Sequence, residues 1–342
     1  MKNLKQILKS MFVAALAVCL VFAASCGTND SNTNGSSNEQ EEKRAYTFVM
    51  PDGAPSLSVV KLMKDYKTID GHKIEYKIVP AAQIGAEFSK GETDLAIMPT
   101  NASAKLYTAK GIKHKLATVN VFGVLYMVGT KPVGSVADLK GEVIYNIGQG
   151  GTPDLMLKYI LAKNNVEYVE NTEAVEGKVS LAYASEASVA VAGLKQGKYS
   201  FAVLGQPVAT NALKAVEGAS VSLDLQAEWN KLTDGDGYTQ AGVVVKDDVA
   251  ADSSFMTALY NALSENYNYI SEKSADVKGI LAENGSGLTF DFTKEVIDAC
   301  NIDCKKASEI RSSIEKYFTE IAAFDKTFIG GKLPDDGYYY NW

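Results

Sequence analysis

The sequence predicts an α/β protein in which two lobes, each a mostly parallel sheet flanked by helices, enclose a ligand cleft. Apolar strands such as 94–98 and 200–204 alternate with helical segments, a pattern typical of parallel sheets that helices cover on both faces. Polar or glycine-rich turns follow several of these strands. The part of the chain able to fold spans about 300 residues, which suits two lobes of ordinary domain size.

Residues 1–25 have the composition of a secretory signal peptide. Three lysines precede the apolar run 11–24, which is shorter than the about 20 residues that a membrane-spanning helix needs. Small residues then precede Cys26. This arrangement resembles the lipobox of bacterial lipoproteins, in which a cysteine is lipidated and becomes the mature N-terminus. We therefore expect lipidation of Cys26; the alternative is a plain signal peptide with a chance cysteine.

Residues 26–44 predict a flexible tether between that cysteine and the folded part. The stretch is rich in Asn, Ser, Gly and Glu and has almost no apolar residue, so it cannot form a core. A tether after a lipidated cysteine lets a folded domain stand off a membrane surface. We expect an extracytoplasmic protein that is anchored to the bacterial cell membrane through its lipid alone.

The charge of the chain excludes some partners. The formal net charge is −7, and removal of residues 1–25, which hold three lysines and no acid, leaves −10. Basic residues gather in no part of the sequence, so we expect no nucleic-acid partner. An acidic surface suits a soluble exported protein.

Strands and helices alternate through the first half of the folded part. The expected elements are a strand at 46–50, a turn at 51–56, a helix at 57–64, a strand at 72–79, a helix at 82–90, a strand at 94–98, a helix at 102–110 and strands at 116–121 and 123–130. The last of these strands is a candidate crossover between the lobes.

The second half continues the alternation and ends in helices. The expected elements are a strand at 143–147, a helix at 155–161, a strand at 178–182, a helix at 186–196, a strand at 200–204, a helix ending at 216, a strand at 239–246 and helices over 253–328. The strand 239–246 is the expected return crossover. We expect lobe 1 over 45–129 and 240–342 and lobe 2 over 130–239, with the aromatic segment 338–342 packed on lobe 1.

The glycine-rich turn after the strand 143–147 is the expected centre of the ligand site. The glycines within Gly148–Gly151 allow backbone N–H groups to approach a ligand closely. Thr152 is the expected N-cap of the next helix, with Pro153 at the first helical position. The helix dipole favours an anion at this end, whereas Asp154 in the first turn could satisfy the dipole itself.

The same arrangement of an apolar strand followed by a polar turn recurs at 51–56, 99–101 and 205–207. In open α/β sheets, ligands bind outside the carboxyl ends of the parallel strands. In a protein of two lobes these ends face one another across a cleft. The sequence therefore predicts that all four turns contribute to one site.

Four segments follow the lipobox and the tether in a particular order and spacing, namely 94–107, 135–141, 148–154 and 330–336. Together these features resemble bacterial ABC-transporter substrate-binding lipoproteins, more narrowly the branch that includes the nitrate, sulfonate, taurine and thiamine-precursor binding proteins. The resemblance covers most of residues 45–342.

The resemblance implies a type II periplasmic-binding-protein fold whose lobes close on a small solute and hand it to an ABC permease and its ATPase. Carried over residue by residue, it places the solute against Gly53, Ala54, Pro55, Ser56, Thr100, Asn101, Gln149, Gly150, Gly151, Thr152 and Gln206. Tyr183 and Trp229 could stack on a flat ring, although such residues more often serve in packing. We expect an anionic or heteroaromatic solute, a monomer, no cofactor and no metal.

Two other classes of function fit a protein of this organisation. An enzyme on the same bilobal fold could act on a small acid or a cofactor precursor, but it would need a general base or nucleophile in the cleft. The strand ends instead offer Gly, Thr, Asn and Gln, which bind ligands but titrate poorly. A surface adhesin or sensor would keep the lobes and lack the transporter.

The histidines and the remaining cysteines give little sign of chemistry. His72 and His114 are the two histidines of the chain, and since each lies among lysines we expect both at the surface. No Cys or His cluster has metal-binding spacing. Cys300 and Cys304 remain after export; at positions i and i+4 of a helix their Cα atoms would lie about 6 Å apart, so a disulfide and two thiols both stay open.

Overall fold

The computed structural model describes residues 43–235 and 237–342. The signal peptide expected over 1–25, Cys26 and nearly all of the expected tether lie outside the described residues. Strand β1 (Lys43–Pro51) includes the last two residues of the range expected as tether. In the described part, no helix is long and apolar enough to cross a membrane.

Seven strands of the described residues form a first sheet with a parallel centre. In spatial order they are β13 (Ile302–Lys306), β5 (His114–Phe122), β12 (Thr239–Lys246), β4 (Leu95–Pro99), β1, β3 (His72–Val79) and β2 (Thr68–Ile69). Strand β1 runs parallel to β3 and β4. The other pairings are antiparallel, so this sheet is mixed, and its parallel part is β3-β1-β4.

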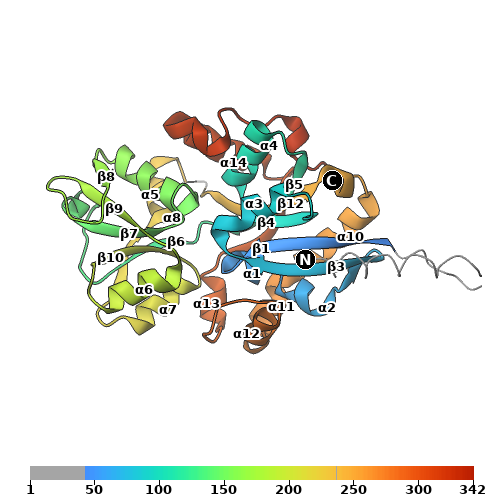
Figure 1. Cartoon of the computed structure of the whole chain (residues 1–342), viewed down its shortest axis with the longest axis horizontal. Helices are drawn as coiled ribbons and strands as arrows, with labels where there is room; N and C mark the ends of the chain where they lie inside the picture. Colours follow the sequence, from blue (N-terminus) through green and yellow to red (C-terminus); the bar gives the residue numbers. More distant parts are fainter. Residues whose placement is uncertain (1–42, 236) are drawn as a thin grey trace, which may run out of the picture. The chain divides into compact units, whose positions relative to one another are not determined.

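A second sheet of six described strands is parallel over more of its width. The strands are β11 (Ser220–Asp224), β6 (Leu125–Gly129), β10 (Phe201–Gly205), β7 (Val143–Ile147), β9 (Val179–Ala184) and β8 (Tyr168–Glu170). Strands β10, β7, β9 and β8 are parallel neighbours, and β6 pairs antiparallel with β10 and β11. The expected α/β class with two helix-flanked sheets is confirmed (Figure 1).

Helices follow most of the strands. Those before the second sheet are α1 (Ala54–Leu57), α2 (Val60–Asp65), α3 (Ile84–Ser89) and α4 (Thr100–Lys110). Those among the strands of the second sheet are α5 (Thr152–Lys163), α6 (Ala187–Lys195), α7 (Val208–Ala215) and α8 (Leu225–Leu232). The remainder are α9 (Asp247–Ala250), α10 (Ser253–Ser264), α11 (Asn266–Glu272), α12 (Ser274–Glu283), α13 (Lys294–Asp298) and α14 (Arg311–Asp325). Short 3-10 turns lie at Ala81–Gln83, Val136–Leu139, Lys326–Ile329 and Asp336–Tyr338.

The pleat of β1 explains how the first sheet acquires two cores. Successive strand residues point to opposite faces, so Phe48 and Met50 pack in one cluster with α2, α10 and α12, whereas Val49 packs in another. That second cluster also contains Ile144 of β7 and Tyr317 of α14. One continuous apolar core therefore joins the two sheets.

Helix α14 makes specific contacts with helices of the second sheet. The Tyr159 hydroxyl on α5 donates to Glu320 at 3.0 Å. The ring of Trp229 on α8 lies 5.5 Å from that of Tyr317, centroid to centroid, in an edge-on arrangement. The C-terminal helix thus links the second sheet to the remainder of the folded part.

The chain changes sheets at two places. It leaves the first sheet between β5 and β6. This change comes before the lobe boundary expected between residues 129 and 130, since β6 already pairs with β10 and β11 of the second sheet. It returns between β11 and β12, where the expected boundary at 239 and 240 falls. The division into lobes itself stays a prediction.

The C-terminal part differs from its expectation in one element. The range 253–328 was expected to be helical, yet β13 interrupts it and pairs antiparallel with β5. The left-handed residue Asn301, with φ 44°, turns the chain out of α13 toward this sheet edge. The aromatic end packs on the first sheet, as expected: the Trp342 indole N–H donates to the Ala117 carbonyl at 3.1 Å.

Candidate functional site

The candidate site lies where the turns after β4 and β7 meet. Asn101 belongs to the first turn of α4 and Thr152 is the first residue of α5, and both are buried. The Thr152 hydroxyl donates to Asn101 Oδ1 at 3.0 Å. The neighbouring Thr100 hydroxyl donates to the Thr239 carbonyl at 2.5 Å. Two expected ligand residues, which follow strands of different sheets, are thus in direct contact.

The turns after β1 and β10 also meet. A Cβ placed on Gly53 would lie 3.7 Å from the backbone oxygen of Gln206. Gly53 has φ 110°, which a residue with a side chain rarely adopts. The Gln206 amide oxygen accepts bonds from the Thr210 N–H and hydroxyl, at 3.1 and 2.9 Å, at the start of α7. All four strand ends therefore contribute to one of two close contacts.

Asp52 organises the turn that follows β1. Its Oδ1 accepts from the Gly53 N–H at 3.1 Å and from the Ser286 hydroxyl at 2.7 Å. The hydroxyl of the fully buried Ser56 donates to the Gly53 carbonyl at 2.9 Å. Ala54 is buried and Pro55 partly buried in the helix that begins there. Ser56 therefore holds the shape of the turn, and Pro55 is the residue of Gly53 to Ser56 that is partly exposed.

The glycine-rich turn after β7 satisfies much of its own backbone. The Gly151 N–H donates to the Gly148 carbonyl at 2.8 Å, and the Gly150 N–H donates to Asp154 Oδ2 at 2.9 Å. The buried Asn146 supports the turn from below, because its side-chain N–H group donates to the Pro153 carbonyl at 3.2 Å. One of the N–H groups expected to bind a ligand is therefore occupied by a carboxylate of the protein.

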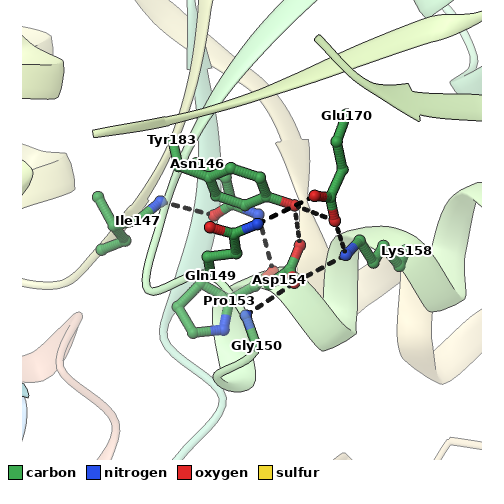
Figure 2. Close-up of polar contacts among 9 residues, drawn as sticks. All are labelled: Asn146, Ile147, Gln149, Gly150, Pro153, Asp154, Lys158, Glu170 and Tyr183. Carbon is green, nitrogen blue, oxygen red and sulfur yellow. Dashed lines mark hydrogen bonds and ion pairs between the residues drawn. The ribbon is translucent and has the colours of Figure 1, made fainter. Parts of the chain in front are cut away.

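That carboxylate lies at the centre of a polar cluster, which we call the Asp154 cluster: Gln149, Asp154, Lys158, Glu170 and Tyr183 (Figure 2). Asp154 is 1 % exposed and accepts from the Tyr183 hydroxyl at 2.7 Å and from Lys158 Nζ at 2.9 Å. Glu170 accepts from Lys158 Nζ at 2.9 Å and from Gln149 Nε2 at 3.0 Å. Gln149 and Glu170 are exposed, so they form the solvent-facing side of the cluster.

The cluster fixes the protonation of its members. Burial raises the pKa of the Tyr183 hydroxyl, and its bond to Asp154 raises it further, so the phenol stays a donor at neutral pH. Burial lowers the pKa of Lys158, but the bonds to Glu170 and Asp154 outweigh that effect and the net pKa is raised. The Lys158 bond lowers the pKa of Glu170. Two carboxylates and one ammonium group therefore leave the cluster with an excess negative charge.

The start of α5 differs from its expectation by one residue. Gly151 is the N-cap, Thr152 is the first helical residue and no side chain caps the helix. The expected cap by Thr152 is wrong because its hydroxyl bonds to Asn101 instead. Gly151 has φ −97°, so the positive φ values that favour glycine are those of Gly148 and Gly150.

Tyr183 and Trp229, the two expected stacking residues, lie in different environments. Tyr183 joins the Asp154 cluster. Trp229 is 1 % exposed, packs among Tyr159, Tyr238 and Tyr317 in tilted and edge-on arrangements, and donates its indole N–H to the Gly237 carbonyl at 2.9 Å. It is a packing residue and cannot stack on a ligand.

Both histidines were expected at the surface, and both are buried. His114 bonds through both ring nitrogens, to the Ser103 hydroxyl at 2.9 Å and the Ile112 carbonyl at 2.8 Å. Burial lowers its pKa to about 4. His72 stacks on Tyr46 with ring centroids 4.2 Å apart. The expectation is wrong because the surrounding lysines direct their charges outward while the rings pack inward.

Cys300 and Cys304 are free thiols in the structure. Cys300 lies in the core beside α13, and its thiol donates to the Val296 carbonyl at 3.2 Å. Cys304 lies in β13. The chain turns between them at Asn301, a break that would ease a disulfide, yet both cysteines are thiols.

Three polar residues of the candidate site were not predicted from the sequence: Asp52, Lys158 and Glu170. The i,i+4 spacing of Asp154 and Lys158 was the available signal, since such a pair lies on one face of a helix. Glu170 comes from β8, a strand absent from the expected elements.

A cavity of about 350 Å³ lies away from the candidate site, beside α12 and α13. It is lined by Ser274, Ala275, Lys278, Asp291, Phe292, Thr293 and Lys294.

No protein-family model and no curated protein sequence matches this chain. A crystal structure described as an ABC transporter from Parabacteroides distasonis is 27% identical, with a TM-score of 0.70 over 86% of this chain and 98% of that chain. The periplasmic aliphatic sulphonate binding protein SsuA of Escherichia coli is 17% identical, with a TM-score of 0.60 over 85% of this chain and 92% of that chain. The alkanesulfonate-binding protein SsuA of Xanthomonas axonopodis pv. citri, solved with MOPS, is 17% identical, with a TM-score of 0.58 over 87% of this chain and 97% of that chain.

These likenesses cover nearly the whole length of each protein as well as both sheets of this one. The two sulfonate-binding proteins share the fold at low identity, and the Parabacteroides protein adds a closer similarity in sequence. The chain therefore has the fold of these periplasmic sulfonate-binding proteins and of the Parabacteroides protein, as the resemblance predicted.

Proposed function

We propose that this protein is the extracytoplasmic solute-binding lipoprotein of an ABC importer, which captures a small organic solute and delivers it to the permease and its ATPase. The observation that carries the proposal is the meeting of α4 and α5. These helices follow strands of different sheets, and their first residues contact each other through Asn101 and Thr152. A solute that replaces this contact would bridge the two lobes.

The proposed solute contacts are the residues expected from the sequence, and the structure suggests which part of the site each one forms. Gly53, Ala54 and Pro55 offer backbone on one side, shaped by Ser56 and Asp52. Gln206 lies beside Gly53. Thr100, Asn101 and Thr152 lie at the contact of α4 with α5, and Gln149, Gly150, Gly151 and Tyr183 belong to the turn after β7 and the Asp154 cluster. The division of the chain into two lobes is part of this proposal.

The chemistry of these groups favours a solute with two different ends. The N-terminal ends of α4 and α5 carry partial positive charge and favour an anionic or strongly accepting group. The Asp154 cluster is negative and its exposed Glu170 accepts hydrogen bonds, so it favours N–H or ammonium groups. A zwitterion or a heteroaromatic compound with N–H groups meets both conditions, whereas a simple anion meets one.

Binding without turnover by a monomer is the mode of action that we propose. A general base must reach a proton of the substrate. Asp154, Lys158, Glu170 and Tyr183 are titratable, but each is held by another member of the cluster. The cluster therefore suits orientation of a solute better than proton transfer.

A thermal-shift screen of sulfonates, carboxylates, amino acids, nucleobases and vitamin precursors tests the proposal, because a ligand of the native state raises the melting temperature. Thr152→Val and Asn101→Ala should lower the affinity for any hit about tenfold or more, since each removes a polar partner from a desolvated site. Thr257→Val on α10, where the hydroxyl donates only to the Ser253 carbonyl, is the matched control.

The solute recovered from the complex should be chemically unchanged. Consumption of a hit during incubation would favour the enzyme alternative. Equal affinity of the Thr152→Val protein and the control would show that the site has been placed wrongly.

A further inference from the structure

A second group of ligand-type atoms lies at the edge of the first sheet, outside the candidate site. Asp70 occupies the turn between β2 and β3, His72 begins β3, and Asp252 is the residue before α10. One ligand atom from each of the three lies within 4.8 Å of the other two. Some 180 residues of chain separate His72 from Asp252, so this group arises only from the fold.

The geometry of His72 leaves a buried lone pair facing this group. His72 is 6 % exposed, and its Nδ1 lies 2.8 Å from the Arg44 carbonyl oxygen. Because a carbonyl only accepts, Nδ1 carries the hydrogen and Nε2 of the neutral ring carries the lone pair. Among the described residues, no hydrogen-bond partner reaches Nε2, which lies 3.5 Å from Asp252 Oδ2. Two acceptors that face each other at this distance require a cation between them.

Both carboxylates accept hydrogen bonds from the protein that fix their orientation, and the Ser254 side chain bonds to Asp70 in addition to Lys43. Asp252 Oδ1 accepts from the N–H groups of Ser254 and Phe255, at 3.1 and 3.0 Å, at the start of α10. Asp70 Oδ2 accepts from Lys43 Nζ at 2.9 Å. Two carboxylates against one lysine leave the group with a net negative charge, which attracts a cation.

The spacing matches first-row transition-metal coordination. Zinc binds imidazole nitrogen and carboxylate oxygen at about 2.0–2.2 Å, so tetrahedral ligand atoms lie about 3.4 Å apart. The 3.5 Å between His72 Nε2 and Asp252 Oδ2 meets this value. The Asp70 oxygen lies within 4.8 Å of both atoms, so a movement of that side chain toward them would complete the site. The bonds from Arg44, Lys43 and the α10 backbone are the outer contacts that hold metal ligands in orientation.

We propose that Asp70, His72 and Asp252 bind a divalent transition metal of the Zn²⁺ type, with water completing the coordination. The imidazole nitrogen selects such a metal over Ca²⁺ and Mg²⁺, which prefer oxygen ligands. The bound metal ties the β2–β3 turn to the start of α10 and stabilises the first sheet at its edge. This site is independent of the proposed solute site.

The two histidines make the test direct. Zn²⁺ added to the full-length protein labelled with ¹⁵N at histidine should shift the His72 Nε2 resonance at about one equivalent, whereas the His114 resonances, from a ring bonded at both nitrogens, should not move. The melting temperature should rise with Zn²⁺ and Ni²⁺ and fall back with chelator, and Ca²⁺ should have neither effect.

Variants separate the ligands from other carboxylates. Asp70→Asn and Asp252→Asn should each lower the Zn²⁺ affinity about tenfold or more. Both changes suit their positions, since Asn tolerates the positive φ of Asp70 and can cap α10. Asp248→Asn, an exposed partner of Arg44 four residues from Asp252, is the matched control and should bind normally. A proton on His72 Nε2 at neutral pH that millimolar Zn²⁺ does not displace would overturn the proposal, as would equal binding by the Asp252→Asn protein.

Discussion

Asp154 is the residue on which the polar side of the candidate site depends. It stands in the first turn of α5, where a negative charge is favoured by the helix dipole, and it accepts bonds from a backbone amide, an ammonium group and a phenol. Its burial makes these bonds strong and makes the loss of any partner costly. The same residue limits the negative charge that a solute can carry near Gly150.

Asp154→Asn should lower the free energy of unfolding by about 1–3 kcal/mol, because Lys158 and Tyr183 lose part of a buried acceptor. The change also removes a negative charge, so the affinity for an anionic solute should rise. Urea denaturation and titration with a hit from the screen measure the two effects. Asp276→Asn, an exposed residue that pairs with Lys64 at 3.7 Å, should change the stability by less than about 0.5 kcal/mol. A weaker binding of anions by the Asp154→Asn protein would contradict this account.

His114 should make the stability of the protein depend on pH. Burial lowers its pKa to about 4, and the nearby Lys246 adds to the effect, whereas the unfolded chain has a pKa of about 6.5. Between these values the unfolded state binds more protons, so stability is full above about pH 6.5 and falls by up to about 3 kcal/mol as the pH drops to about 4.

Denaturation of the wild-type and His114→Gln proteins at a series of pH values checks this prediction. The variant should be less stable at pH 7 and should show a flatter dependence between pH 6.5 and 4. Parallel curves for the two proteins would show that His114 does not cause the dependence.

At the scale of the element, the turn from Gly148 to Gly151 has backbone N–H groups that are already hydrogen-bonded within the protein. Two of its glycines have positive φ, and its amides at Gly150 and Gly151 are both bonded. The turn is therefore preorganised, and a solute that bound there as proposed would meet a surface already fixed by the protein's own hydrogen bonds.

Gly150→Ala should weaken solute binding and lower stability by about 1–2 kcal/mol, the cost of a side chain in the left-handed region. The φ of Gly150 is 73° and a new Cβ would meet no atom within 4 Å, so strain is the expected cause and not a clash. Gly177 has the same φ and the same open surroundings, and Gly177→Ala should lose the same stability without loss of binding. Calorimetric titration and thermal melts compare the pair. Equal affinities would remove Gly150 from the site.

At the scale of the whole molecule, α14 and the shared core join the two sheets on one side, while the candidate site joins them through side-chain contacts at the strand ends. Apolar packing around Tyr317 and Trp229 is extensive, and both side chains are 1 % exposed. The contact between Asn101 and Thr152 is a single neutral hydrogen bond, worth about 1 kcal/mol. A solute can therefore replace the hydrogen bond between Asn101 and Thr152 far more readily than the apolar packing around Tyr317 and Trp229.

Lipidation of Cys26 is the prediction that concerns the protein in its cell. Mass spectrometry of the membrane-extracted protein should show an N-terminal Cys26 with a diacylglyceryl adduct, since small residues precede that cysteine after a short apolar run. The Cys26→Ala protein should be released from the membrane. Membrane retention of that variant would contradict the lipoprotein assignment.

The alternation of strands and helices was determined by the sequence itself. Runs such as Leu95–Met98 are apolar at every position and are buried on both faces, a pattern that a parallel strand requires. Strand β13 escaped prediction because Ile302 is its one buried residue and three of the four that follow are charged, so its pairing depends on the edge that β5 offers. Periodicity reports local burial, and an edge strand has little of it.

For the candidate site, the sequence located the turns because glycine, proline and small polar residues after an apolar strand have few other uses. Which of their groups remain available was decided by tertiary structure. The Thr152 hydroxyl bonds to Asn101 and does not cap its own helix. Asp154 accepts from the Gly150 N–H and is held in place by bonds from Lys158 and Tyr183. Likewise Asp70 and His72 met Asp252 only when α10 packed against the sheet edge. Local propensity sets where the chain turns, whereas the partner of a polar side chain depends on what the fold brings within about 3 Å of it.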